Sequence, residues 1–190
     1  IEGSEDMPPQ EPDFAGFVFA PSRRQVSPEQ ASALGRLLDP TIVPVGVFVD
    51  ESIEKIASLF QDGTIRMAQL HGQETEESIR ALKRLVDVPV IKAIRVSQPE
   101  DILAWSSSSA DFLLLDNGPG GTGRSFDWRL IPPIDKRWFL AGGIDEHNIH
   151  QALSLSPPPW CIDISSGAET DGVKDRAKIL NLVRLAREES

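Results

Sequence analysis

The sequence has little cysteine, histidine and positive charge, and each shortage excludes a class of protein. Cys161 is the only cysteine among 190 residues, so no internal disulfide can form and we expect a reducing, cytoplasmic location. Acidic residues number 29 against 19 Lys and Arg, and the net charge of −10 argues against nucleic acid or an anionic membrane surface as a partner. The three histidines form no ligand pattern with the single cysteine, so we expect no metal site.

Long apolar runs are also missing. No run approaches the roughly 20 residues that a membrane-spanning helix needs. The first residues, IEGSEDMPPQEP, are acidic and rich in proline, unlike a signal or transit peptide. They lack an initiator Met, so we expect that an upstream segment is absent from this sequence. The length predicts one domain over residues 1–190, in which residues 1–13 form an irregular N-terminal segment.

What the sequence does contain is a series of short, nearly continuous apolar runs. Runs of this kind are typical of parallel strands that are covered on the outside by helices. Seven are visible: Phe14–Phe19, Val43–Val49, Ile65–Leu70, Val88–Val96, Asp111–Asp116, Arg137–Gly143 and Cys161–Gly167.

Helical patterns fill the intervals between these runs. Ser27-Pro28-Glu29-Gln30 has an N-cap Ser, a Pro at the first helical position and a Gln suited to a capping box. Apolar residues then recur at helical spacing in five segments: Leu34, Leu37 and Leu38; Ile53, Ile56, Ala57 and Phe60; Ile79, Leu82, Leu85 and Val86 after Thr75; Ile149, Ala152 and Leu153 after Asp145; and Ile179, Leu182, Val183 and Leu185. Alternating strands and helices predict βαβ units and a parallel sheet.

Two α/β architectures fit this alternation, a closed (β/α)₈ TIM barrel and an open doubly wound sheet. An open sheet that binds a nucleotide usually has a glycine-rich turn after its first strand, whereas here APSRRQ follows the first run. The glycine-rich turns follow the last three runs, and a barrel commonly builds its phosphate site after its final two strands. We favour the barrel, with its first strand missing or unrecognisable in this sequence.

In a barrel, the active site lies at the carboxyl ends of the strands. The polar residues and glycines at these ends are Ser22, Arg23, Arg24, Asp50, Gln69, His71, Arg95, Asp116, Gly142, Gly143, Asp163, Ser165, Ser166 and Gly167. Asp116 ends a buried run, and it is either a loop anchor or a general acid, since burial raises the pKa of a carboxyl group toward the useful range.

The other strand-end groups also allow a structural and a functional interpretation. Gly142-Gly143 and Ser165-Ser166-Gly167 are ordinary turns or a paired phosphate site, because glycine lets backbone N–H groups approach a phosphate closely. Arg23-Arg24 is a solvated basic pair or an anion clamp, and the acidity of the chain favours the clamp. For His71 and Cys161 the commoner role is packing in the core.

Several segments together resemble the phosphoribosylanthranilate isomerase family of tryptophan biosynthesis. They are GFVFAPSRRQVSPEQA, VPVGVFVD, AQLHGQE, LLLDNGPGGTGRSFDW, FLAGGI and DISSGAETDGVKD, in that order from Gly16 to the C-terminus. The resemblance implies a (β/α)₈ barrel that performs an Amadori rearrangement of an aminoribose phosphate bearing anthranilate, without metal or organic cofactor. A small phosphosugar is then the expected partner, and the chain is a monomer or a homodimer.

The resemblance also assigns roles to residues of this chain. Asp116 matches the general acid that opens the ribose ring, and the glycines that follow it match a loop able to close over the site. Arg24 matches the arginine that grips the anthranilate carboxylate. The phosphate turns match Gly142, Gly143, Ser165, Ser166 and Gly167.

The sequence departs from the family at its N-terminus. The family opens with a strand of lysine, an aliphatic residue, cysteine and glycine, whose cysteine is the general base, and no such motif occurs in these 190 residues. Glu2 is a conceivable remnant. We therefore expect a sheet that is open, locally disordered or paired with another copy between Phe14–Phe19 and Cys161–Gly167. We also expect these 190 residues not to catalyse unless an upstream strand supplies the base. The alternatives are a non-catalytic or truncated phosphosugar-binding form, and another phosphate-binding barrel enzyme such as a sugar-phosphate epimerase.

Overall fold

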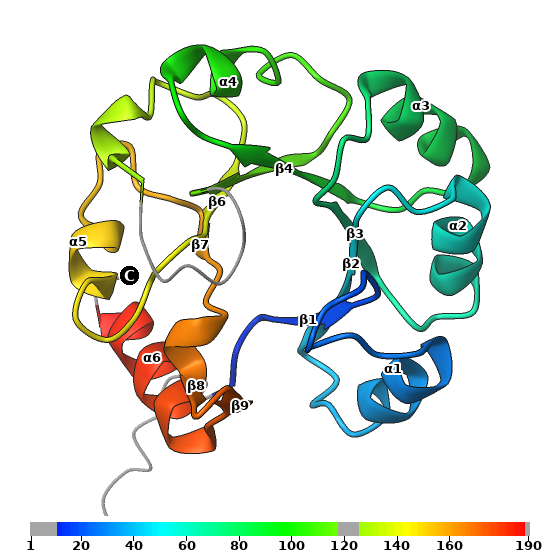
Figure 1. Ribbon diagram of the computed structural model, residues 1–190, viewed down its shortest axis with the longest axis horizontal. Coiled ribbons are helices and arrows are strands. Elements are labelled where there is room, and N and C mark those ends of the chain that lie inside the picture. Colours follow the sequence, from blue (N-terminus) through cyan, green and yellow to red (C-terminus); the bar gives the residue numbers. More distant parts are fainter. Residues whose placement is uncertain (1–10, 118–125, 189–190) are drawn as a thin grey trace, which may run out of the picture.

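The chain folds into a curved parallel sheet surrounded by helices, as a computed structural model that describes residues 11–117 and 126–188 shows (Figure 1). Seven strands are hydrogen-bonded side by side in chain order, and all six pairings are parallel. The strands are β1 (Phe14–Val18), β2 (Val43–Phe48), β3 (Met67–Leu70), β4 (Val90–Arg95), β5 (Phe112–Asp116), β6 (Trp138–Leu140) and β7 (Cys161–Ile162). Chain order and parallel pairing are those of a TIM barrel, so the predicted α/β barrel class is confirmed.

Helices follow the strands and form the outer ring of Figure 1. They are α1 (Pro28–Gly35), α2 (Ile53–Gln61), α3 (Glu76–Leu85), α4 (Pro99–Leu103), α5 (Ile149–Leu153) and α6 (Arg176–Glu188), with short 3₁₀ turns η1 (Trp128–Leu130) and η2 (Ser166–Ala168). The predicted capping box at Ser27 and Gln30 is present, and Thr75 caps α3. In the part of the chain that the structure describes, no helix is long and apolar enough to cross a membrane.

Two expectations about these elements need correction, and one element was not expected. Leu34, Leu37 and Leu38 do not share a buried helical face, since Leu37 and Leu38 follow the end of α1 and Leu34 and Leu37 are 45% and 82% exposed. The strand expected over Cys161–Gly167 is regular only at its first two residues, because the chain turns into η2 at Ser166. An additional hairpin of β8 (Glu169–Thr170) and β9 (Val173–Lys174) follows and was not predicted.

Burial divides the sheet into an inner and an outer face. Val45, Met67, Ile91, Leu114 and Phe139 pack against one another inside the curve of the sheet, and Cys161 lies at the edge of this cluster. Two larger clusters pack the outer face against the helices. This packing of both faces explains why the strands are nearly continuous apolar runs.

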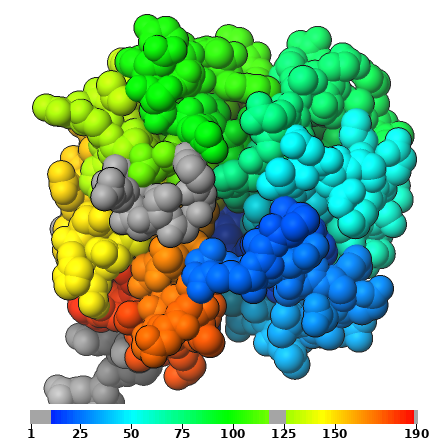
Figure 2. Space-filling model, viewed as in Figure 1, coloured from blue at the N-terminus to red at the C-terminus, as the bar shows by residue number. Residues whose placement is uncertain are grey.

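The described sheet has two edges, β1 and β7. In Figure 1 the ring of helices is interrupted between α6 and α1, at the same place. The loop after β1 crosses this interruption to the β8–β9 hairpin, and Figure 2 shows the blue segment lying against the orange one. The expected opening between the first and last strands is therefore present in the described part of the chain, while residues 1–10 lie outside it.

Candidate active site

Asp116 is the last residue of β5 and lies at the carboxyl end of the sheet. It is 9% exposed, and its two carboxylate oxygens have different partners. Oδ1 accepts a hydrogen bond of 2.7 Å from the backbone N–H of Asn117, and Oδ2 lies 3.2 Å from Nε2 of His71, which follows β3. The carboxyl group is thus held from both sides at a strand end, where a buried general acid would be placed.

His71 is itself held by a side chain of β3. Nε2 of the Gln69 amide lies 2.9 Å from Nδ1 of His71, and an amide N–H₂ group can only donate. Nδ1 therefore accepts, and the neutral imidazole carries its proton on Nε2, which faces Asp116. Sequence reasoning took His71 for a core histidine, whereas its side chain is 30% exposed and contacts the candidate acid.

The turn after β6 approaches the same carboxyl group. A Cβ atom on Gly142 would lie 2.6 Å from Asp116 Oδ1, and Gly142 has a positive φ of 87°. Both features require glycine. Gly143 also has positive φ, and its carbonyl accepts a hydrogen bond from Asn148.

Two titratable groups of the β7 segment stand near this cluster. Burial raises the pKa of Asp163, and the negative charge of Asp116 raises it further, while His71 and Lys174 act in the opposite direction. Burial and then Asp163 raise the pKa of the Cys161 thiol to about 12. Cys161 packs with the inner cluster, and a thiol that stays protonated at neutral pH is a poor base, as its predicted packing role implies.

The turns after β6 and β7 lie against one another. A side chain on Gly167 would clash with the carbonyl oxygen of Ile144, and its Cβ would lie 3.1 Å from the backbone of Asp145. Lys174 donates a hydrogen bond of 2.7 Å to the carbonyl oxygen of Ser165, which adds a cation beside the turn. The structure therefore brings the two predicted phosphate turns together.

Arg23 and Arg24 do not extend freely from the loop after β1. Nε and Nη2 of Arg24 donate to the two carboxylate oxygens of Glu169 at 2.7 and 3.0 Å, and Arg23 donates to Glu169 at 2.6 Å. Lys174 lies 3.4 Å from the same carboxylate. The Arg24 hydrogen bond first, and then the charges of Lys174 and Arg24, hold the pKa of Glu169 at about 2.

Sequence reasoning missed Glu169. The signal that could have found it is the acidic residue two positions beyond the predicted phosphate turn, in a chain whose adjacent arginines had no assigned partner. The structure makes Glu169 the link between the loop after β1 and the β8–β9 hairpin.

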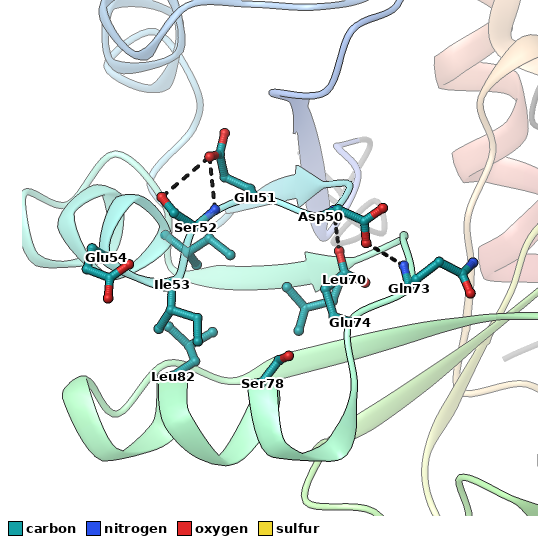
Figure 3. A pocket seen from close by; sticks show the side chains of 11 residues that line it. Asp50, Glu51, Ser52, Ile53, Glu54, Leu70, Gln73, Glu74, Ser78 and Leu82 are labelled. Carbon is teal, nitrogen blue, oxygen red and sulfur yellow. Dashed lines mark hydrogen bonds between the residues drawn. The ribbon is translucent and has the colours of Figure 1, made fainter.

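An acidic cavity lies beside this site, between the β2–α2 and β3–α3 connections (Figure 3). Its volume is about 370 Å³. Two of its carboxylates already have partners, since Asp50 accepts from the Gln73 N–H, and Glu74 accepts from the N–H groups of Asp50 and Gly72. Among the described residues, no group of His, Cys, Asp and Glu could hold a metal ion.

Most of the predicted site is thus assembled at one end of the barrel. Gly142 lies against Asp116, and Gly167 lies against Ile144 and Asp145, which follow the Gly142-Gly143 turn. Arg24 is instead bound to Glu169. The glycine loop predicted to close over the site, residues 118–125, lies outside the described residues.

Comparison with known proteins identifies the family. A model of the family described as N-(5'phosphoribosyl)anthranilate (PRA) isomerase matches residues 4–185. The chain is 43% identical over 180 residues to the N-(5'-phosphoribosyl)anthranilate isomerase of Endomicrobium trichonymphae, covering 93% of this chain and 88% of that one. It is 40% identical to the enzyme of the same name from Acetivibrio thermocellus, with 93% and 87% covered.

Solved structures give the same result. The phosphoribosyl anthranilate isomerase of Thermotoga maritima superimposes with a TM-score of 0.84 at 35% identity, covering 94% of this chain and 90% of that chain. The Thermus thermophilus structure gives 0.81 at 37% identity, with the same coverage. With its barrel order, its strand-end aspartate and its paired glycine turns, the chain belongs to the N-(5'-phosphoribosyl)anthranilate isomerase family.

Proposed function

We propose that the chain catalyses the isomerisation of N-(5-phosphoribosyl)anthranilate to the carboxyphenylamino-deoxyribulose phosphate in tryptophan biosynthesis, with Asp116 as the general acid. The observation that carries this role is the placement of the Asp116 carboxyl at the carboxyl end of β5, fixed by Asn117 and His71. In such a step Asp116 protonates the furanose ring oxygen, the bond from that oxygen to the anomeric carbon breaks, and the nitrogen lone pair forms a Schiff base.

Two anion sites would hold the ends of the substrate. The contact of Gly167 with Ile144 and Asp145, which directly follow Gly142-Gly143, supports a phosphate site, because both turns contain glycines that let N–H groups reach an anion. A related isomerase structure has been solved in complex with reduced 1-(o-carboxyphenylamino)-1-deoxyribulose 5-phosphate, at 31% identity and a TM-score of 0.78, which supports a phosphosugar ligand for this chain.

Arg24 is proposed for the anthranilate carboxylate. Glu169 receives two of its N–H groups, and a guanidinium has five. The same side chain can therefore be oriented by Glu169 and still donate to a second carboxylate. The carbon-bound proton of the Schiff base needs a separate base. The Cys161 thiol, whose pKa is raised to about 12, is a poor candidate for it.

Replacing Asp116 tests the acid directly. Asp116→Asn keeps the size and a hydrogen-bond donor but removes the transferable proton, so we expect kcat to fall at least about 10²-fold, with KM little changed. The measurement is the loss of anthranilate-adduct fluorescence during turnover. An unchanged kcat would remove Asp116 from the mechanism.

A second experiment tests the phosphate site. Inorganic phosphate should compete with the substrate and protect the N–H groups of Gly143, Ser166 and Gly167 in amide NMR spectra. Shifts confined to other turns would locate the phosphate elsewhere, and the site assignment would then be wrong even if the activity were present.

A further inference from the structure

The hydrogen bonds that join Gln69, His71 and Asp116 all run toward Asp116. The proposed role of Asp116 as an acid does not explain this direction. Gln69 donates to Nδ1 of His71 over 2.9 Å, and Nε2 of His71 lies 3.2 Å from Asp116 Oδ2. A single tautomer satisfies both contacts, with the ring proton on Nε2. The three side chains therefore form a chain of donors that ends at the carboxyl group.

We propose that His71 is a positioning residue for the acid: with its tautomer fixed by Gln69, its Nε2–H stabilises the Asp116 carboxylate that forms as Asp116 gives its proton to the substrate. This inference rests on the proposed role of Asp116. No proton leaves His71 in this step, because the proton that reaches the ring oxygen comes from Asp116 alone.

The gain from this arrangement is larger in the transition state than in the ground state. A hydrogen bond to a charged acceptor is stronger than one to a neutral acceptor. As negative charge develops on Asp116, the bond from His71 strengthens, and stabilisation that grows along the reaction raises kcat rather than affinity alone. The fixed position of Nε2 means that little reorganisation is needed at that moment.

Groups on three other strands stand around the contact between His71 and Asp116. Gln69 on β3 is uncharged, and Arg95 on β4 is in register with Asp116 on β5. Across the barrel, Asp163 of the β7 segment feels the fields of His71, Asp116 and Lys174, and its pKa is raised.

The tautomer can be tested without turnover. The chain has three histidines, so long-range ¹H–¹⁵N spectra of the 190-residue protein can be assigned with His147→Gln and His150→Gln. We expect His71 to show a protonated Nε2 and an unprotonated Nδ1, and we expect Gln69→Leu to give a mixture of tautomers. A protonated Nδ1 in the unaltered protein would overturn the proposal.

Kinetics of the active enzyme test the consequence for the acid. His71→Leu should lower kcat by about tenfold or more, the effect of one hydrogen bond to a charged group, with KM little changed. In His71→Leu the hydrogen bond that favoured the Asp116 carboxylate is lost, so Asp116 should release its proton at higher pH. The part of the pH–rate profile where activity falls with rising pH should therefore move to higher pH. His71→Gln, whose amide can donate from a similar place, should recover part of both effects.

The control is His147→Leu, since the His147 side chain is 83% exposed and should change neither quantity. If Asp116→Asn keeps full kcat, the proposed function fails and this inference fails with it. Two results with an inactive Asp116→Asn would overturn this inference alone. In the first, His71→Leu keeps kcat; in the second, it loses kcat but its pH–rate profile does not move. Either result would make His71 a structural residue.

Discussion

Two glutamates of this protein, Glu74 and Glu169, are equally buried at 8% exposure, yet their cationic partners differ. Glu74 pairs at 2.8 Å with Lys92 of β4, whose side chain is 4% exposed. Glu169 pairs with Arg23 and Arg24, whose side chains are 55% and 26% exposed. One network is enclosed between neighbouring strands, and the other spans the interruption of the sheet.

From this difference we expect the Glu74 contact to stabilise the fold and the Glu169 contact to serve ligand recognition. Lys92 also donates to the carbonyl oxygens of Leu70 and Gly72, so its ammonium group is fully engaged with the end of β3. The arginines remain accessible to solvent and have N–H groups beyond those given to Glu169. We therefore expect changes to the Lys92 network to appear in stability, and changes to the Glu169 network to appear mainly in recognition.

The largest effect should follow the loss of Lys92. Lys92→Met leaves Glu74 buried without its cation, and removing one partner of a buried ion pair costs about 3–5 kcal/mol of unfolding free energy. Urea denaturation followed by circular dichroism measures this. The double variant Lys92→Met with Glu74→Gln should recover much of the loss, because no uncompensated charge remains. A single variant as stable as the original would show that this pair is not what fixes the ends of β3 and β4.

Arg24 should give the second largest effect, and in recognition rather than in stability. Arg24→Ala should weaken binding of the anthranilate carboxylate by about 1.5–3 kcal/mol, the contribution of a charged hydrogen bond. Arg24→Lys keeps the charge but loses the planar fork, so it should restore little. The measurement compares inhibition by anthranilate analogues with and without the carboxylate. Equal losses for both analogues would assign Arg24 to the structure or to the phosphate.

The acid stability of the protein should report on Glu169. Its pKa falls from the ordinary 4.5 to about 2 on folding, so its contribution is fully present above pH 4.5 and is lost as the pH falls toward 2. Because its arginine partners are partly exposed, we expect only about 1–2 kcal/mol from this source. Glu169→Gln should make stability between pH 4.5 and 2 less dependent on pH. Asp163, whose pKa is raised, contributes equally to both proteins and cancels in the comparison. Parallel stability curves would show that Glu169 is not held by the arginines in solution.

The sequence predicts some strands closely and others only at their first residues. The runs at Val43–Val49 and Asp111–Asp116 became β2 and β5 with nearly unchanged bounds, because strands covered on both faces must be apolar throughout. The run Cys161–Gly167 kept only two strand residues, since the same glycine and serine that suit a phosphate turn also end a strand.

Side-chain pairs across the fold could not be predicted in the same way. The Arg24–Glu169 contact joins residues 145 positions apart, and the His71–Asp116 contact joins residues 45 apart. Neither separation matches the spacing of residues that share a face of a helix or a strand, so only the folded sheet brings the members of each pair together. The family resemblance supplied a role for Asp116 and Arg24 but not for the groups that hold them.

The smallest effect should come from Arg23. Its comparison with Arg24 tests whether the two arginines bound to Glu169 have different roles. Arg23 gives Glu169 one hydrogen bond from a side chain that is 55% exposed, whereas Arg24 gives two from a more enclosed position. Exposed ion pairs contribute about 0–1 kcal/mol because water and salt screen them and two long side chains must be ordered. Arg23→Ala should therefore change unfolding free energy and carboxylate recognition by less than about 1 kcal/mol each, and raising the salt concentration should remove most of that difference. Should Arg23→Ala instead reduce analogue binding as strongly as Arg24→Ala, Arg23 would be the carboxylate ligand and Arg24 its support, because two arginines on one glutamate can exchange these roles without any change in the fold.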